Sequence, residues 1–468
     1  MSNVTEAINN PGLAPEERLA ALRSRDTLRS GDAPRSGAGS FTGTGRTAAD
    51  RTGEVNNHIH TIYSFSPYTP AMAALKAYEA GLAAAGSVDH DSAAAGAELK
   101  AACAELGIGG CSGFEMRVSF KKRPDGSASP LAARKINNPD SQGIAYITVQ
   151  GIPSPALEKA AAFLKPVREA RLVRSRKMTE SANLLLSGAG LSPIDFENDV
   201  VKKSQYERGG EITERHILAA AAVKCIEKFG AGADIAGGLH RSLGIVIPEK
   251  PAKLLSDSSN PHYLYDLLGV LKTGLLPRIF IQPGEQECIP AKAAVDFALS
   301  IEAVPAYSYL GDVGESLTGD KKPEKFEDDY LPELFEEIHA AGFRAVTYMP
   351  PRNTAEQLER VRKFCAEGNY MEISGVDINS SRQSFNCPQV LRPGLRHLLD
   401  TTWALVAHEY FASSDPAWGL FSSKNPLAPL PLSRRIEIYS GAGKSLDLKH
   451  PGDSAPALIE QLRRGKAP

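Results

Sequence analysis

The most constraining feature of the sequence is an alternation, from Val55 onward, of short apolar runs with alanine-rich segments of helical periodicity. Short apolar runs bounded by turn residues are typical of buried strands, and their alternation with helices is typical of βα units. The first units predict strands at 55–60, into Val88 and at 107–114, with helices at 71–85 and 93–105. This part of the chain is therefore predicted to adopt an α/β fold.

The same alternation resumes in the second half of the chain, after a mostly helical stretch. This stretch predicts a helix over 157–164, ahead of Pro166, and another over 213–229 with Thr213 as its N-cap. Further strands are predicted at 144–149, 278–282, 304–310, 345–349 and 370–376, with helices near 331–341 and 355–367. We expect a barrel-like α/β fold with a helical insertion, in which catalytic side chains lie at the carboxyl ends of the strands.

The predicted organisation divides the chain into five parts. Residues 1–53 are rich in Ser, Gly, Thr, Arg and Asp, so a flexible N-terminal tail is expected. The remaining parts are a first barrel segment over 54–154, the helical insertion over 155–272, a second barrel segment over 273–440 and a C-terminal tail over 441–468.

Composition narrows the class of function. The 468 residues carry a formal net charge of -2 with both signs interspersed, so no extended field favours a nucleic acid polymer or an anionic membrane. The six cysteines include no Cys-x-x-Cys pair, which argues against a zinc ribbon and fits a reducing compartment. Neither a signal-peptide pattern nor an apolar run of about 18 residues occurs, so a cytoplasmic location is expected. The oligomeric state stays open.

Chemistry-bearing side chains gather where predicted strands end. His58 and His60 are two residues apart in a strand, so both side chains point to one face and can bind one metal ion. Packing or surface hydrogen bonding explains such a pair equally well. The second strand ends in Asp89, His90 and Asp91, where a helix cap by Asp91 is the alternative. Two weak motifs thus point toward the same end of the sheet.

Two more strand ends carry carboxylates. Glu115 ends the third strand, and Asp377 with Asn379 follows a much later one. The carboxyl ends of barrel strands meet at one face, so four such clusters together indicate a catalytic divalent metal.

In order and spacing these motifs resemble the PHP (polymerase and histidinol phosphatase) superfamily of metal-dependent phosphoesterases. The resemblance covers residues 55–153 and, more loosely, 200–385. It implies a distorted (β/α)7 barrel of PHP type with an inserted, mostly helical subdomain. The segment Thr213-Glu-Arg-His216 falls where TrpH-like nucleotide phosphatases and exonucleases have an Arg-Pro-His helix start, so the chain is loosely similar to that branch.

The chain departs from the family pattern at four metal-ligand positions. Phe65 stands where the first motif usually has a metal-bridging aspartate. Thr148 and Tyr309 stand nearest to two expected histidines, and Asn379 replaces the last one. The resemblance therefore implies fewer metal ions than the trinuclear pattern of the family.

The ligands of one family metal are all retained: His58, His60, Glu115 and Asp377. Two imidazoles and two carboxylates favour Zn²⁺, Mn²⁺ or Fe²⁺, so we expect one tight divalent transition-metal site. Asn379 and Asp312 are candidates for a weaker second ion or for supporting contacts. His90 and Asp89 are the candidates for moving the proton of a metal-activated water.

Cations after predicted strands are candidates for binding substrate. They are Arg117, Lys321 with its neighbour Lys322, Arg352 and Arg382. His216, at a helix start, is a further candidate. Each can instead be a surface or structural residue, and His216 can be a histidine satisfied within its helix. His408 and Glu409 on a later helix are either a late ligand and base or core residues.

Three functions fit these residues. The first is a phosphoesterase acting on a small phosphorylated metabolite or nucleotide. The second is a mononuclear amidohydrolase-like lactonase or amidase, since one metal suffices for attack at carbon, whereas two ions about 4 Å apart suit phosphoryl transfer better. The third is a non-catalytic, ligand-binding PHP-like module, which the retention of one full ligand set disfavours.

Overall fold

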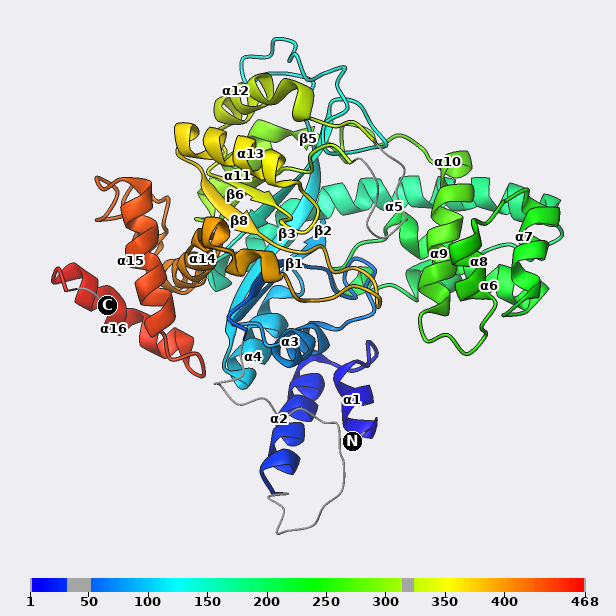
Figure 1. The fold of residues 1–468 in the computed structure, drawn as a ribbon, viewed down its shortest axis with the longest axis horizontal. Coiled ribbons are helices and arrows are strands. Elements are labelled where there is room, and N and C mark those ends of the chain that lie inside the picture. Colours follow the sequence, from blue (N-terminus) through cyan, green and yellow to red (C-terminus); the bar gives the residue numbers. More distant parts are fainter. Residues whose placement is uncertain (1, 32–51, 314–323, 467–468) are drawn as a thin grey trace.

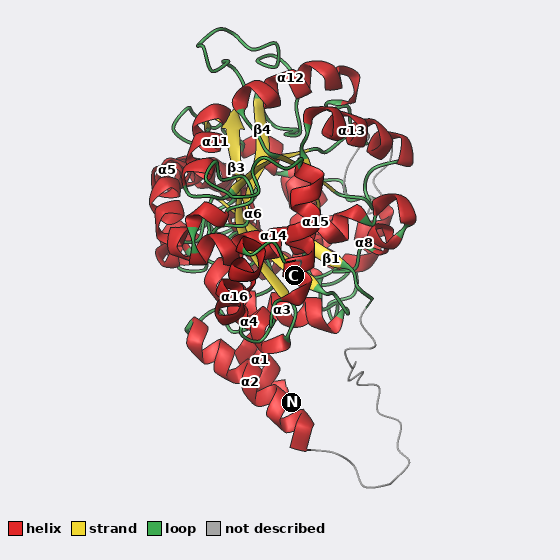
Figure 2. Cartoon of the chain, turned by 90° about the vertical axis from the view of Figure 1, so that its left-hand side faces the viewer, coloured by secondary structure: helices red, strands yellow, loops and turns green. Residues whose placement is uncertain are grey.

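Seven strands form a nearly closed barrel in the computed structural model, which describes residues 2–31, 52–313 and 324–466 (Figures 1 and 2). In barrel order they are β1 (Val55–Ile59), β2 (Ala84–His90), β3 (Gly109–Ser119), β4 (Ile144–Gln150), β6 (Val304–Ser308), β7 (Ala345–Tyr348) and β8 (Met371–Ser374). The short β5 (Ile289–Pro290) pairs with β3. Only β4 runs antiparallel to its neighbours, which makes this a distorted barrel, as predicted.

Polar groups of β1 close the barrel onto the segment that follows β8. The backbone N–H of His60 donates to the carbonyl of Ile378 (2.9 Å), and the N–H of Ile378 donates to the carbonyl of His58 (3.0 Å). The amide side chain of Asn56 bonds both backbone groups of Val376 (3.0 and 2.9 Å). A buried asparagine in this strand is therefore satisfied, and the carboxyl ends of β1 and β8 lie side by side.

Helices cover the outside of the barrel and one of its ends. Against the outer face lie α3 (Pro70–Glu79), α4 (Gly96–Leu106), α11 (Ala291–Ser300), α12 (Leu331–Ala341) and α13 (Ala355–Gly368). Helix α14 (His397–Ser414) is buried on most sides and packs against the first residues of several strands. Within the described residues, no helix combines the length and apolar character that a membrane crossing requires.

The inserted helices have a hydrophobic core of their own. They are α5 (Leu157–Gly188), α6 (Glu214–Phe229), α7 (Asp234–Leu243), α8 (Glu249–Leu255), α9 (Tyr263–Gly274) and α10 (Leu276–Ile279). We call α5–α10 the helical subdomain; most of it lies to one side of the barrel (Figure 1). The predicted N-cap at Thr213 is confirmed, and His216 completes its capping box.

Two predicted elements in this region are wrong. The apolar run at 278–282 is not a strand, because Ile279 ends the short helix α10 and packs into the core of the helical subdomain. Pro166 does not end its helix, because α5 continues through it with Leu164 and Val167 both buried against the barrel. Tertiary packing on both sides of the proline thus outweighs its local cost.

The prediction of a flexible tail is wrong for residues 2–31, although the helical pattern of residues 15–23 within it is confirmed. Helices α1 (Ser2–Ile8) and α2 (Pro15–Gly31) lie beside α3 and α4 (Figure 1), and residues 32–51 are outside the described part. Arg18 of α2 and Glu98 of α4 form an ion pair at 2.5 Å, with side chains only 1% and 2% exposed. Polar composition misleads here because one buried pair and a few apolar contacts anchor the segment.

The predicted C-terminal tail from residue 441 is also wrong. Residues 441–445 end α15 (Leu432–Ser445), and residues 451–463 form α16 (Pro451–Arg463). Ala442 and Leu458 are buried in the same apolar cluster as α14. These two helices therefore cover α14 rather than extending into solvent.

Candidate metal centre

His58, His60 and Glu115 converge beside the carboxyl ends of β1 and β2. Glu115 does not end its strand as predicted, because β3 continues to Ser119 by pairing with β4. All three are buried, and one potential ligand atom from each lies within 4.8 Å of the others. The Nε2 atoms of His58 and His60 lie 3.7 and 3.8 Å from the two carboxylate oxygens of Glu115. Donors that bind one ion at 2.0–2.2 Å lie about 3–4 Å apart, so this donor set fits a transition-metal ion.

The position of His58 depends on a close approach by Gly375. A Cβ added to Gly375 would lie 2.5 Å from the Cβ of His58 and 2.7 Å from its backbone nitrogen. Only glycine therefore allows the chain leaving β8 to run this close to the first histidine.

His60 is oriented by a chain of hydrogen bonds that ends at Asp89. The Ser64 hydroxyl donates to Asp89 (2.6 Å) and lies 3.2 Å from Nδ1 of His60. Because its one hydrogen goes to Asp89, the hydroxyl oxygen accepts Nδ1–H of His60, which leaves the Nε2 lone pair for a metal. Burial lowers the pKa of His60 to about 3, which also favours the neutral imidazole.

Asp89 lies behind the metal-binding face. It is fully buried and also accepts hydrogen bonds from the backbone N–H and the hydroxyl of Thr61 (2.6 and 2.7 Å). Three donors occupy its two oxygens, so this geometry suits orientation of His60 rather than the predicted proton transfer by Asp89.

His90 lies beside Glu115 on the neighbouring strand, and the two residues are paired in register. Its Nδ1 is 3.0 Å from a Glu115 oxygen, and its side chain is 23% exposed. Burial raises the pKa of Glu115, but His90, His58 and His60 together bring it below its usual value. His90 therefore has contact with both the carboxylate and solvent, as a proton-transfer residue needs, and that role stays a prediction.

Asp377 lies at the rim of the three-residue group. Its Oδ1 is 3.5 Å from Nε2 of His60, and the side chain is 36% exposed. The side-chain amide of Asn379 donates to the same oxygen (2.7 Å). Asn379, predicted as a candidate second-ion ligand, thus holds Asp377 in place.

Arg117, predicted to contact substrate, is instead buried in an ion network. Its guanidinium lies 2.9 Å from Glu214 and 3.5 Å from Glu287. Arg171 and Arg174 of α5 bind the same two carboxylates. Its partners come from the helical subdomain and from the segment after it, so Arg117 joins these parts of the chain rather than facing solvent.

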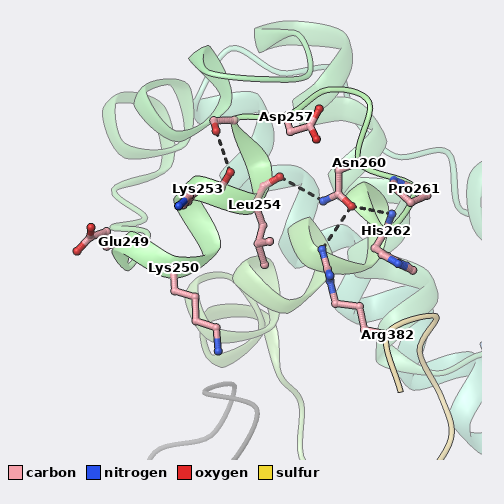
Figure 3. Close-up of a pocket in the computed structure, with 10 residues that line it drawn as sticks. Glu249, Lys250, Lys253, Leu254, Asp257, Asn260, Pro261, His262 and Arg382 are labelled. Atoms are coloured by element: carbon pink, nitrogen blue, oxygen red, sulfur yellow. Dashed lines mark hydrogen bonds between the residues drawn. The ribbon is translucent and has the colours of Figure 1, made fainter. Parts of the chain in front are cut away.

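Arg382, also predicted to contact substrate, donates two hydrogen bonds to Asp266 of α9 (2.6 and 2.7 Å). It borders an open pocket of about 880 Å³ on the helical subdomain, with Lys250, Lys253 and His262 among its lining residues (Figure 3). The pocket is separate from the three-residue group, since it shares no residue with it.

Other predicted residues have contacts of their own outside the three-residue group. His216 accepts the backbone N–H of Thr213 (3.0 Å), as a histidine satisfied at its helix start does. Asp312 accepts the backbone N–H of Phe326 (2.7 Å) within its own loop. Arg352 follows β7 in a turn in which its backbone N–H donates to the carbonyl of Met349 (2.9 Å). Lys321 and its neighbour lie outside the described residues.

His408 and Glu409 are core residues of α14. His408 accepts the backbone N–H of Leu420 (2.8 Å) and lies 3.0 Å from the carbonyl of Gly151. Glu409 accepts from the backbone and side chain of Ser112 and lies 2.5 Å from Lys100. These contacts satisfy the polar groups of both residues. Helix α14 packs against the first residues of the parallel strands, at the opposite end of the barrel from the three-residue group.

Arg215 is the residue at this site that sequence reasoning missed. From α6 of the helical subdomain, its guanidinium donates to the side-chain and backbone oxygens of Asn379 (2.7 and 2.9 Å). It also lies over the ring of Phe65, at 5.4 Å from the centroid. Its position next to His216, in the Thr213–His216 motif discussed above, could have indicated that Arg215 has a role at the site.

Two solved structures are among those similar to this chain. One is an amidohydrolase from Chromobacterium violaceum with bound sulfate and no metal (19% identity, 74% of this chain and 95% of that one, TM-score 0.44). The other is a proposed metal-dependent phosphoesterase from Bifidobacterium adolescentis (16% identity, 74% and 95%, TM-score 0.45). No protein-family model and no curated protein matches the chain. We infer no activity from likeness at this level.

Proposed function

We propose that the chain is a metal-dependent hydrolase in which His58, His60 and Glu115 hold one divalent transition-metal ion. The observation that carries this proposal is the buried three-residue group, whose ligand atoms lie within 4.8 Å of one another. Asp377, 3.5 Å from His60, is the fourth ligand in this proposal. The chain would then be a divergent member of the PHP superfamily.

Each residue around the group has a distinct task in the proposed reaction. When bound, the ion would supply Lewis-acid catalysis and lower the pKa of a water to about 7. Ser64 and Asp89 keep the His60 ring in the tautomer that leaves Nε2 free. His90, which lies beside Glu115 and is partly exposed, would move a proton between the site and solvent through its imidazole ring.

For the substrate we propose a small phosphorylated metabolite or nucleotide, cleaved at a phosphoester. The resemblance of the strand-end motifs to phosphoesterases supports this choice. Hydrolysis of a lactone or amide is the second candidate, because the described residues hold a single group of this kind. With one ion, attack at carbon needs no second cation to stabilise a leaving phosphate oxygen.

Metal analysis of the purified chain tests the proposal first. Protein prepared without chelator is expected to hold about one Zn, Mn or Fe ion per chain, and His58→Ala is expected to lose it. His240→Ala, on the exposed surface of α7, is the matched control. A wild-type chain that binds no added Mn²⁺ or Zn²⁺ would contradict the proposal.

A parallel screen of phosphate esters and lactones then separates the two substrate classes. Release of phosphate that is lost in His58→Ala and kept in His240→Ala supports the first class. Lactone or amide cleavage with the same dependence supports the second. Metal binding without either activity would favour the non-catalytic, ligand-binding module.

A further inference from the structure

Two arginines, Arg382 and Arg215, link the helical subdomain to the segment that follows β8, and their partners differ. A further contact joins His262 to Ser381 (2.7 Å). Arg382 binds Asp266 of α9 (2.6 and 2.7 Å) at an exposed position. Arg215 of α6 reaches Asn379 through both ends of its guanidinium (2.7 and 2.9 Å). Only the second link continues toward the metal centre, because Asn379 donates to Asp377.

The contacts of Arg215 form an unbroken path to His60. The Asn379 amide uses its oxygen for Arg215 and its N–H for Asp377 (2.7 Å each). The oxygen of Asp377 that accepts this bond is also the one 3.5 Å from Nε2 of His60. A planar guanidinium that fixes two oxygens fixes the orientation of the amide, and the amide then sets the direction of the carboxylate.

The environment of Arg215 holds it in this pose. Phe65 lies under the guanidinium, and His216 meets the same ring edge-on at 4.9 Å. Phe65 has a positive φ of 73°, a conformation that costs free energy for a bulky side chain and persists only where packing holds it. The Arg215 Nε atom is buried and has no hydrogen-bond partner among the described residues. The side chain is therefore held by its two hydrogen bonds to Asn379.

We propose that Arg215 is a positioning residue through which the helical subdomain sets the orientation of Asp377, and hence the metal affinity of the centre. This inference rests on the proposed function, since it takes Asp377 as a ligand. It assigns the helical subdomain a part in assembling the metal site.

Metal affinity of the full chain tests the inference, measured as the Kd for Mn²⁺ by equilibrium dialysis. Loss of an outer contact to a ligand typically weakens metal binding about 10- to 100-fold, so this fall is expected for Arg215→Met. Asn379→Ala, which breaks the same path without touching α6, is expected to weaken binding similarly. Arg215→Lys keeps one of the two contacts and is expected to lose less.

Two further variants separate positioning from a merely structural role. Asp266→Asn removes the charge that binds Arg382, the other arginine link between the helical subdomain and the same segment, so it is expected to keep the wild-type Kd. In an Asp377→Asn background, Arg215→Met is expected to add no further loss, because its path ends at Asp377. An unchanged Kd in Arg215→Met, or a full additional loss in the Asp377→Asn background, would overturn the inference.

The same measurements distinguish this inference from the proposed function. If wild type binds Mn²⁺, His58→Ala does not, and Arg215→Met matches wild type, only the role of Arg215 is overturned. If wild type and His58→Ala bind Mn²⁺ alike, the metal centre itself is overturned and the role of Arg215 with it.

Discussion

Glu327 is a buried carboxylate that should make the folding stability depend on pH. The residue is fully buried, and one oxygen accepts the backbone N–H of Leu310 (2.8 Å) and the hydroxyl of Tyr307 (3.3 Å). The other oxygen has no partner among the described residues. Burial is the main cause that raises the pKa of Glu327 to about 7 from 4.5, and neighbouring Asp328 adds to it.

The sign of the effect follows from which state holds the proton. Below pH 4.5 both states are protonated, so Glu327 has no effect. Between pH 4.5 and 7 the unfolded chain loses the proton while the folded chain keeps it, so stability falls as pH rises. A pKa difference of about 2.5 amounts to about 3 kcal/mol, of which about 2 kcal/mol develops between about pH 5 and 7.5.

Glu327→Gln removes this titration and keeps an acceptor oxygen for Leu310. The difference in unfolding free energy between wild type and the variant, measured by urea denaturation at about pH 5 and 7.5, is expected to move about 2 kcal/mol in favour of the variant. A difference that stays constant across this range would refute the reasoning, because it would mean that the carboxylate ionises as easily folded as unfolded.

Three further perturbations test other parts of the structure. Gly375→Ala places a Cβ 2.5 Å from that of His58 and should weaken Mn²⁺ binding at least about 10-fold, measured by equilibrium dialysis; an unchanged Kd would show that the close approach is not required. Ser64→Ala breaks the link from Asp89 to His60 and should weaken Mn²⁺ binding about 10- to 100-fold, with wild-type affinity as the contrary result. Arg171→Met leaves its buried partner Asp91 (2.5 Å) unpaired and should cost about 3–5 kcal/mol in urea unfolding, and a loss below about 1 kcal/mol would contradict this.

The strand-end histidines could be found from sequence because their geometry is local. Residues two apart in a strand share a face, so His58 and His60 reach one point whatever surrounds them. Glu115 was predicted from its place after an apolar run, although its strand continues to Ser119. The βα alternation could be predicted for the same reason. The spacing of apolar residues lies within each element, and capping residues such as Thr213 lie next to the helix that they cap.

The roles of Arg117 and Arg18 could not be found this way because their partners are distant in sequence. Arg117 looks like a substrate contact two residues beyond Glu115, but its partner Glu214 is 97 positions away. Arg18 lies in a polar segment, and its partner Glu98 is 80 positions away. A local pattern does not reveal such pairs. Composition therefore predicted a tail, and the position after a predicted strand predicted an accessible cation, where the structure has buried ion pairs.

Charged side chains of the helical subdomain contact the barrel at several points, in addition to the apolar contacts of α5. Arg171 and Arg174 of α5 bind carboxylates beside β3, and Arg215 of α6 binds the segment after β8. Phe65 supports this last contact from the loop after β1. In the motif that the chain resembles, that position carries a metal-bridging aspartate. If Arg215 orients Asp377 as proposed, the phenylalanine at this position supports that arginine in place of binding a second ion, and a single metal ion and the docking of the helical subdomain would then be two aspects of one arrangement.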